Sequence, residues 1–114
     1  MYIDQTVPFA HPYLLQSHYD RHGHEFSVAN EREYEQLADR FMSQPPNADL
    51  FDGVCVNPRT SGAIDRVRLH GKTRWYGVAF EVLTVRTFFV QNHREIRDAG
   101  GPRAFVDLKC LETF

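Results

Sequence analysis

The chain has 114 residues, of which 42% are hydrophobic and 25% are charged, so it suits one folded domain and excludes a disordered polymer. No apolar run approaches the length needed to cross a bilayer, and Met1–Gln5 lacks the basic and apolar regions of a secretory signal, which predicts a cytoplasmic protein without membrane contact. Cys55 and Cys110 have no metal-site spacing, so we expect two reduced thiols, with a disulfide as the alternative if the domain is exported.

Charge is unevenly distributed along the chain, although the net charge is only −2. Residues 1–52 hold nine acidic and three basic residues (net −6), whereas residues 53–94 hold two acidic and seven basic residues (net +5). A basic segment of this kind attracts a polyanion such as RNA even in a slightly acidic protein. The alternative is an ordinary mixed surface on which the two halves neutralise each other.

Two helices are predicted in the first half of the chain. The first begins near Pro12, because proline suits the first helical turn, and ends at about His22 with Gly23 as its C-terminal cap. The second follows Asn30, which has capping-box spacing with Glu33. Its apolar positions recur at helical spacing and predict a buried stripe, made of Tyr34, Leu37, Ala38, Phe41 and Met42.

From Asp52 onwards the apolar residues alternate, which predicts strands over residues 53–56, 64–70, 73–80 and 84–90. Short links between these strands favour an antiparallel sheet. We also expect a short helix over Asn92–Asp98 and a last strand over Phe105–Leu108. The predicted fold class is α+β, with two N-terminal helices followed by a four- to five-stranded antiparallel sheet. The single domain, 1–114, then has a helical part at about 12–44, a sheet part at about 52–91 and a C-terminal extension at 92–114.

The end of the first helix carries the clearest chemistry. His18 and His22 lie one helical turn apart, and Arg21 lies between them. Imidazoles exchange protons near neutral pH, and a guanidinium beside them can hold an anion. The alternative is a solvated helix end that happens to carry histidines. The spacing also suits zinc, but the sequence offers no third ligand, so we predict neither a metal site nor a cofactor.

The strand at 64–70 adds a row of basic side chains. Alternation places Arg66, Arg68 and His70 on one face, which would cradle a phosphate; the alternative is a solvent-exposed strand face. RNA cleavage by its own ribose hydroxyl needs a base, an acid, and cationic or hydroxyl donors for the phosphate oxygens. The residues that supply these groups without a metal are His18, His22, Arg21, Arg66, Arg68, Arg86 and Thr87.

Three motifs follow one another in the chain: HxxRHGxEF over His18–Phe26, YExLAxxF over Tyr34–Phe41 and VRTFF over Val85–Phe89. With Tyr76–Ala79 between the last two, this set resembles small bacterial and phage toxin domains of the barnase/EndoU/colicin/RelE-like ribonuclease superfamily, which often end longer polymorphic toxins. The resemblance implies helices ahead of a four-stranded antiparallel sheet, and an active site of helix histidines with basic and hydroxyl residues from the strands. Carried over by position, it marks as catalytic His18, His22, Arg86 and Thr87, with Arg21 in support.

The chain departs from that pattern at several points. Ser27 stands where such domains tend to have glycine, and the tail after Gln91 is longer than expected. Arg86 and Thr87 are adjacent, so a regular strand sends their side chains to opposite faces. Both can face one site only if a β-bulge intervenes.

The leading hypothesis is a metal-independent endoribonuclease, a toxin domain that cleaves host RNA such as tRNA after delivery into a target cytoplasm. His18 or His22 would be general base or acid. Arg86 with Arg66 or Arg68 would hold the phosphate, and Thr87 would donate a hydrogen bond. An acidic immunity or antitoxin protein would cover the basic strands.

The alternative hypothesis is a non-catalytic phage or mobile-element protein that inhibits a host enzyme. Its interaction surface would be the acidic face of the second helix, made of Glu31, Glu33, Glu35 and Asp39. A nuclease-like fold can persist without nuclease activity, so fold alone does not separate the two hypotheses.

Overall fold

A computed structural model of the protein describes residue 9 and residues 12–57, 63–80 and 84–112. The elements follow the order α1 (Pro12–His22), a 3₁₀ turn η1 (Gly23–Glu25), α2 (Glu31–Ser43), β1 (Leu50–Asn57), β2 (Ala63–His70), β3 (Trp75–Phe80), β4 (Thr84–Val90), α3 (His93–Ala99) and α4 (Pro102–Glu112). The α+β class is confirmed, but the helix count differs from the prediction: the described residues form four α-helices, two ahead of the sheet and two after it.

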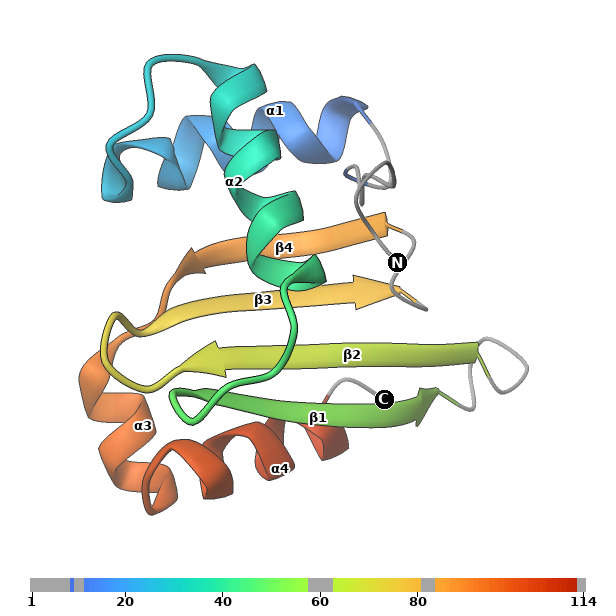
Figure 1. Ribbon diagram of the computed structural model, residues 1–114, viewed down its shortest axis with the longest axis vertical. Coiled ribbons are helices and arrows are strands. Elements are labelled where there is room, and N and C mark those ends of the chain that lie inside the picture. Colours follow the sequence, from blue (N-terminus) through green and yellow to red (C-terminus); the bar gives the residue numbers. More distant parts are fainter. Residues whose placement is uncertain (1–8, 10–11, 58–62, 81–83, 113–114) are drawn as a thin grey trace.

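The described strands form one antiparallel sheet in the order β1-β2-β3-β4, as the short connections predicted. Figure 1 shows α2 crossing one face of this sheet, α1 alongside β4, and α4 beside β1. We call the two faces of the sheet the α2 face and the α4 face. Arg68 and its cross-strand partner Gly77 belong to the α2 face, because a side chain at Gly77 would meet the Met42 sulfur.

Two hydrophobic clusters hold the helices on the sheet. On the α2 face, four residues of the predicted stripe of α2 are buried with Phe26 and Phe88 against the strands, and Leu37 is partly buried beside them. The Tyr34 hydroxyl donates a hydrogen bond to the backbone carbonyl of Phe88, which fixes α2 to β4. On the α4 face, Phe105 and Val106 pack with residues of β2 and β3. Helices therefore pack on both faces of the sheet.

The capping of α2 follows the sequence prediction. The Asn30 side chain accepts from the Glu33 backbone N–H at 3.0 Å, and the Glu33 carboxylate accepts from the Ala29 N–H at 3.0 Å. Gly23 behaves differently from the prediction, because it opens the η1 turn instead of adopting a left-handed cap. A side chain at Gly23 would lie 2.6 Å from the ring of Tyr19, so glycine allows this close approach.

The C-terminal segment needs the largest correction. The helix expected over Asn92–Asp98 is present as α3, but the strand expected over Phe105–Leu108 is wrong, because this stretch lies inside α4. Two glycines with positive φ, Gly100 and Gly101, make the turn between the helices. Phe105 and Val106, two of the apolar residues in the predicted strand, instead face the sheet from one side of α4.

A disulfide joins Cys55 of β1 to Cys110 of α4, so the expectation of two reduced thiols is also wrong. At Gly53, two residues before Cys55, an added side chain would lie 2.8 Å from a Val106 methyl group and 2.9 Å from the Cys110 sulfur. The missing side chain lets α4 approach the strand closely enough for the two sulfurs to bond.

The row of basic side chains on β2 is not a solvent-exposed cradle. Arg68 is fully buried, and two of its nitrogens donate to the Asp52 carboxylate at 2.6 and 3.0 Å. Its remaining terminal nitrogen donates to the carbonyls of Phe41 and Gln44 at 2.9 and 2.7 Å. Arg68 therefore satisfies the carbonyls at the C-terminal end of α2 and ties that end to the sheet. Its donors are used inside the fold, so we leave it out of the candidate site.

We predict that Arg68→Ala lowers the free energy of unfolding by about 3–5 kcal/mol. The substitution leaves the partly buried Asp52 carboxylate and the carbonyls of Phe41 and Gln44 without their hydrogen-bond donor. Arg66→Ala is the matched control on the same strand face, where the side chain is partly exposed, and should change stability by about 0.5 kcal/mol or less. Urea titration followed by circular dichroism measures both. Equal midpoints for the two variants would contradict the structural role of Arg68.

We predict that Cys110→Ser lowers the free energy of unfolding by about 2–4 kcal/mol, because the disulfide closes a loop of 55 residues. Urea titration of the wild type with and without dithiothreitol should give the same difference. A wild-type midpoint that dithiothreitol leaves in place would contradict the prediction.

Candidate functional site

One face of α1 points at the edge strand β4. Leu14, His18 and His22 are spaced by four residues and so form one stripe along the helix. His18 is buried at 8% exposure, against the ring of Phe9 and the side chain of Thr87. The His18 Nδ1 atom lies 3.4 Å from the Thr87 hydroxyl oxygen. Packing of α1 against β4 therefore places a histidine beside a strand hydroxyl.

Burial, with smaller contributions from the neighbouring Arg21 and His22, lowers the pKa of His18 from 6.5 to about 4. The His18 ring is therefore neutral at pH 7. A neutral imidazole keeps a lone pair on one ring nitrogen, so this ring can accept a proton or a hydrogen bond.

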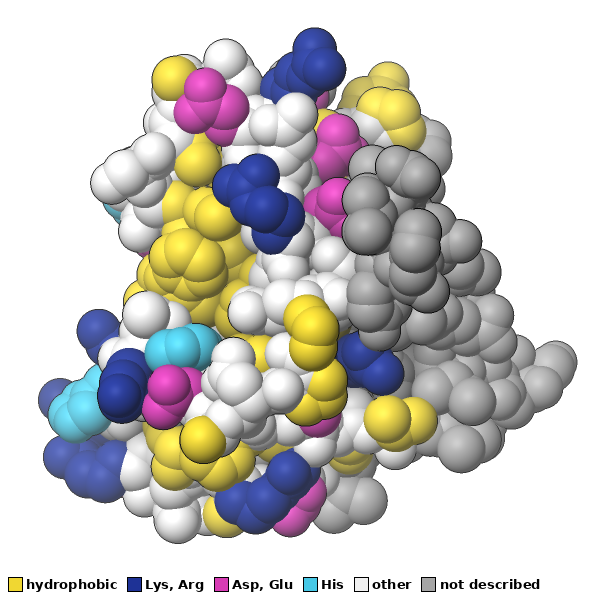
Figure 2. All heavy atoms as spheres, in the orientation of Figure 1, with side chains coloured by type: hydrophobic (Ala, Val, Ile, Leu, Met, Phe, Trp, Pro, Cys, Tyr) yellow, Lys and Arg dark blue, Asp and Glu magenta, His cyan; other side chains and the backbone are white. Residues whose placement is uncertain are grey.

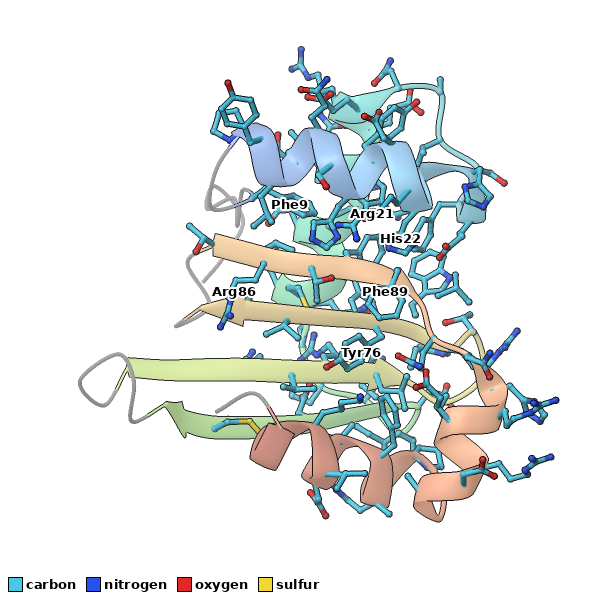
Figure 3. All side chains as sticks on the ribbon, turned by 180° about the vertical axis from the view of Figure 1, so that it is seen from behind. Phe9, Arg21, His22, Tyr76, Arg86 and Phe89 are labelled. Carbon is cyan, nitrogen blue, oxygen red and sulfur yellow. A yellow bond between two sulfur atoms is a disulfide. The ribbon has the colours of Figure 1, made fainter. Side chains whose placement is uncertain are left out.

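His22 lies next to His18, with 5.9 Å between the two ring centroids. The His22 ring stacks on Phe89 of β4 at 5.0 Å between centroids, and its side chain is 23% exposed. Its Nδ1 atom lies 2.7 Å from a carboxylate oxygen of Glu25. In Figure 3, which views the molecule from behind, Arg21 and His22 extend from α1 toward β4, and Phe89 lies beside His22.

Glu25 is a residue of this site that sequence reasoning missed. Its carboxylate pairs with His22 and also accepts a hydrogen bond from the Val90 backbone N–H at 2.7 Å. The spacing of three residues from His22 was a signal for an imidazole–carboxylate pair. The contact to Val90 lies 65 positions along the chain, and no local pattern reveals it.

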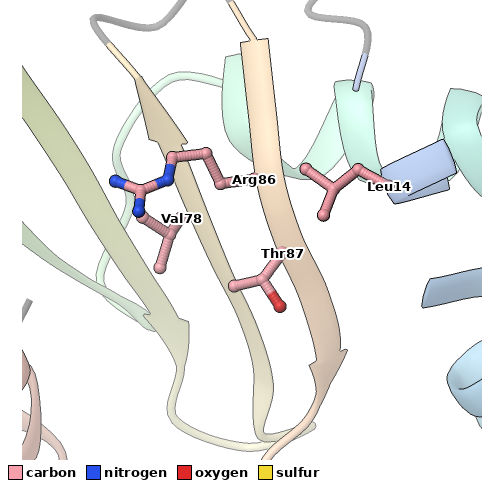
Figure 4. A pocket seen from close by; sticks show the side chains of 4 residues that line it. All are labelled: Leu14, Val78, Arg86 and Thr87. Atoms are coloured by element: carbon pink, nitrogen blue, oxygen red, sulfur yellow. The ribbon is translucent and has the colours of Figure 1, made fainter. Parts of the chain in front are cut away.

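The strand side of the site depends on a β-bulge. Thr87 pairs with Val78, but the next pair joins Val85 to Ala79, so Arg86 is an extra residue on β4. The bulge lets Arg86 and Thr87 face the same side, which a regular strand forbids. Both side chains line one pocket of about 310 Å³ together with Leu14 and Val78 (Figure 4).

The pocket lies on the α4 face of the β3–β4 part of the sheet, because Val78, which belongs to the hydrophobic cluster on that face, lines it together with Thr87. Arg21 of α1 is exposed, and its guanidinium donates to the carbonyl and hydroxyl oxygens of Ser17 at 3.3 and 3.2 Å. The candidate site therefore has two neighbouring parts: His18, His22, Glu25 and Arg21 on the helix side, and Thr87 with Arg86 in the strand pocket, which the contact between His18 and Thr87 joins.

The rest of the predicted cradle lies elsewhere. Arg66, Arg68 and His70 share the α2 face, opposite to the pocket. The His70 Nδ1 atom accepts from the backbone N–H groups of Lys72 and Thr73 at 3.2 and 3.1 Å, which stabilises the β2–β3 turn. The structure therefore separates this row from the helix histidines. On the α2 face, basic and acidic side chains are interspersed (Figure 2).

The acidic face of α2 is partly used inside the fold. Glu33 caps its own helix, and the Glu35 carboxylate accepts from the Phe9 backbone N–H at 3.2 Å. Two of the four carboxylates that would form an interaction surface therefore hold local structure.

In the described parts of the chain, no three His, Cys, Asp or Glu side chains gather closely enough to hold a metal ion. Within the same residues, none of the helices has the length and apolar character that a bilayer crossing requires. Comparisons of the chain with known protein families, with curated proteins and with solved structures gave no match.

We predict that acid destabilises the fold through His18. The unfolded chain binds the His18 proton near pH 6.5, whereas the folded protein binds it only near pH 4. More protons are bound by the unfolded state in this window, so the stabilisation is complete above pH 6.5 and is lost as pH falls toward 4, by about 2–3 kcal/mol.

NMR titration of the His18 ring should give a pKa of about 4 in the folded protein. Urea titrations of the wild type and of His18→Leu across the same pH range should show a shallower decline for the variant. A wild-type His18 that titrates near 6.5 would contradict this prediction.

Proposed function

We propose that the protein is a metal-independent endoribonuclease that cleaves RNA by attack of a 2′-hydroxyl on the adjacent phosphorus. One observation supports the proposal: His18 lies 3.4 Å from the Thr87 hydroxyl, Thr87 lines a pocket together with Arg86, and the His22 ring stacks beside His18. A base, an acid and fixed donors for phosphate oxygens are the groups that this reaction needs.

The geometry favours a particular division of roles. His18 is neutral at pH 7 and contacts Thr87, so it accepts the proton of the 2′-hydroxyl. The 2′-oxygen then bonds to phosphorus, and the 5′-oxygen leaves with a proton from His22. Arg86 supplies positive charge and Thr87 a hydroxyl donor to the phosphate oxygens, with Arg21 in support.

The proposed setting is that of a toxin domain. Its substrate is host RNA such as tRNA, and it works in the cytoplasm of a target cell after delivery. The disulfide between Cys55 and Cys110 supports passage through an oxidising compartment, where such bonds form and persist. An acidic immunity or antitoxin protein that covers Arg86 is the expected partner.

We predict that His18→Ala lowers the rate of RNA cleavage by about 10²–10⁴-fold, because it removes a general base. Arg86→Ala should lower it by about 10²-fold, because it removes charge stabilisation at the phosphate. Cleavage of labelled tRNA measures both, with folding checked by circular dichroism. Arg66→Ala, on the opposite face of the sheet, should cleave like the wild type.

Two further outcomes belong to the same assay. Chelation of divalent metals should leave the wild-type rate unchanged, and RNA with a 2′-deoxyribose at the cut position should resist cleavage. Full activity of His18→Ala would refute the assignment. If neither wild type nor variant harms a bacterium that expresses it, and both bind a host protein tightly, the non-catalytic alternative replaces the nuclease.

A further inference from the structure

We infer that Glu25 is the positioning residue of the site: it fixes the His22 ring so that Nε2 is the nitrogen that exchanges protons there. The expected effect on RNA cleavage rests on the proposed nuclease function, whereas the contacts of Glu25 with His22 and Val90 do not depend on it. Nothing in the chemistry of RNA cleavage requires a carboxylate at this place, so the role comes from the contacts of Glu25.

Both oxygens of the Glu25 carboxylate are engaged. Oε2 lies 2.7 Å from the Nδ1 atom of His22, and Oε1 accepts from the backbone N–H of Val90 at 2.7 Å. Val90 is the last residue of the edge strand β4, so this bond ties the carboxylate to the sheet. The carboxylate is thus a fixed acceptor rather than a mobile one.

A fixed acceptor decides where the His22 proton sits. A carboxylate only accepts hydrogen bonds, so Nδ1 of His22 must carry its proton toward Glu25. In the neutral ring the lone pair is then on Nε2. Proton exchange with a bound ligand therefore runs through Nε2.

Phe89 and Glu25 together remove the rotational freedom of this ring. Phe89 stacks on it with 26° between the planes, which sets the plane of the imidazole. The bond from Nδ1 to Glu25 sets the rotation within that plane. The η1 turn (Gly23–Glu25) makes this arrangement possible, because it brings a carboxylate back beside a histidine three residues earlier.

The test is Glu25→Gln, which has nearly the same shape. The glutamine carbonyl oxygen can still accept from Val90, but its amide group donates to Nδ1 of His22. Nδ1 must then become the acceptor, which moves the proton of the neutral ring to Nε2. Glu33→Gln is the matched control, because the Glu33 carboxylate also accepts a backbone N–H, that of Ala29, but belongs to the cap of α2 and not to a histidine pair.

Nitrogen-15 NMR of the His22 ring at alkaline pH distinguishes the two tautomers. We expect the proton on Nδ1 in the wild type and in Glu33→Gln, and on Nε2 in Glu25→Gln. Thermal midpoints should stay close in all three proteins. RNA cleavage should fall at least about tenfold in Glu25→Gln, through kcat rather than KM, and should not fall in Glu33→Gln.

A His22 tautomer that is the same in Glu25→Gln as in the wild type would overturn the inference. A tautomer that moves while the cleavage rate stays unchanged would overturn the positioning role. If the wild type cleaves no RNA, the nuclease proposal fails, and the NMR result still decides whether Glu25 fixes the ring.

Discussion

The packing of α1 along the outer edge of β4 is the contact on which the proposed site depends. β4 is an edge strand, so its outward backbone groups need partners other than another strand. The Glu25 carboxylate accepts a hydrogen bond from the Val90 N–H near the C-terminal end of β4, and Phe9 forms a parallel β-bridge with Val85 near its N-terminal end. The packing of α1 between these two contacts brings His18 and His22 to the sheet. The same part of the chain therefore covers the edge of β4 and positions the two histidines.

The bulge at Arg86 is the second geometric condition. In a regular strand, Arg86 would point to the α2 face, away from Thr87. One extra residue in β4 brings the two side chains into the same pocket. A guanidinium and a hydroxyl then lie on one side of a strand, within reach of the helix that carries the imidazoles. The site is thus made by an irregularity of the sheet rather than by its regular alternation.

Some charged residues of this protein stabilise the fold, and others lie at the proposed site. Arg68 and Asp52 form a buried pair that holds the end of α2, so part of the basic segment serves structure. Burial beside Arg21 lowers the pKa of His18, which keeps this ring neutral and allows it to lie in an apolar setting. In the proposed nuclease site, Arg86 and Arg21 would supply the positive charge for a phosphate. Arg68 shows that a basic residue counted in the sequence can be used inside the fold.

The sequence by itself determined the elements whose signals are local. The cap at Asn30 and the apolar stripe of α2 lie within one helix, and short links made the sheet antiparallel. The histidine pair was also readable, because a helix repeats every 3.6 residues. Alternation gave the strands of the sheet but did not show which face of each strand would be covered.

Tertiary structure decided everything that depends on a contact between distant segments. Phe105 and Val106 fit a strand or a helix equally well, and packing against β2 and β3 selected the helix. The partner of Cys55 lies 55 positions away, and the partner of Glu25 on β4 lies 65 positions away. Alternation in the sequence predicted that Arg68 would lie on an exposed face, but α2 covers this face and buries the side chain. Local periodicity fixes secondary structure, whereas burial, bulges and long-range hydrogen bonds exist only once the chain has folded.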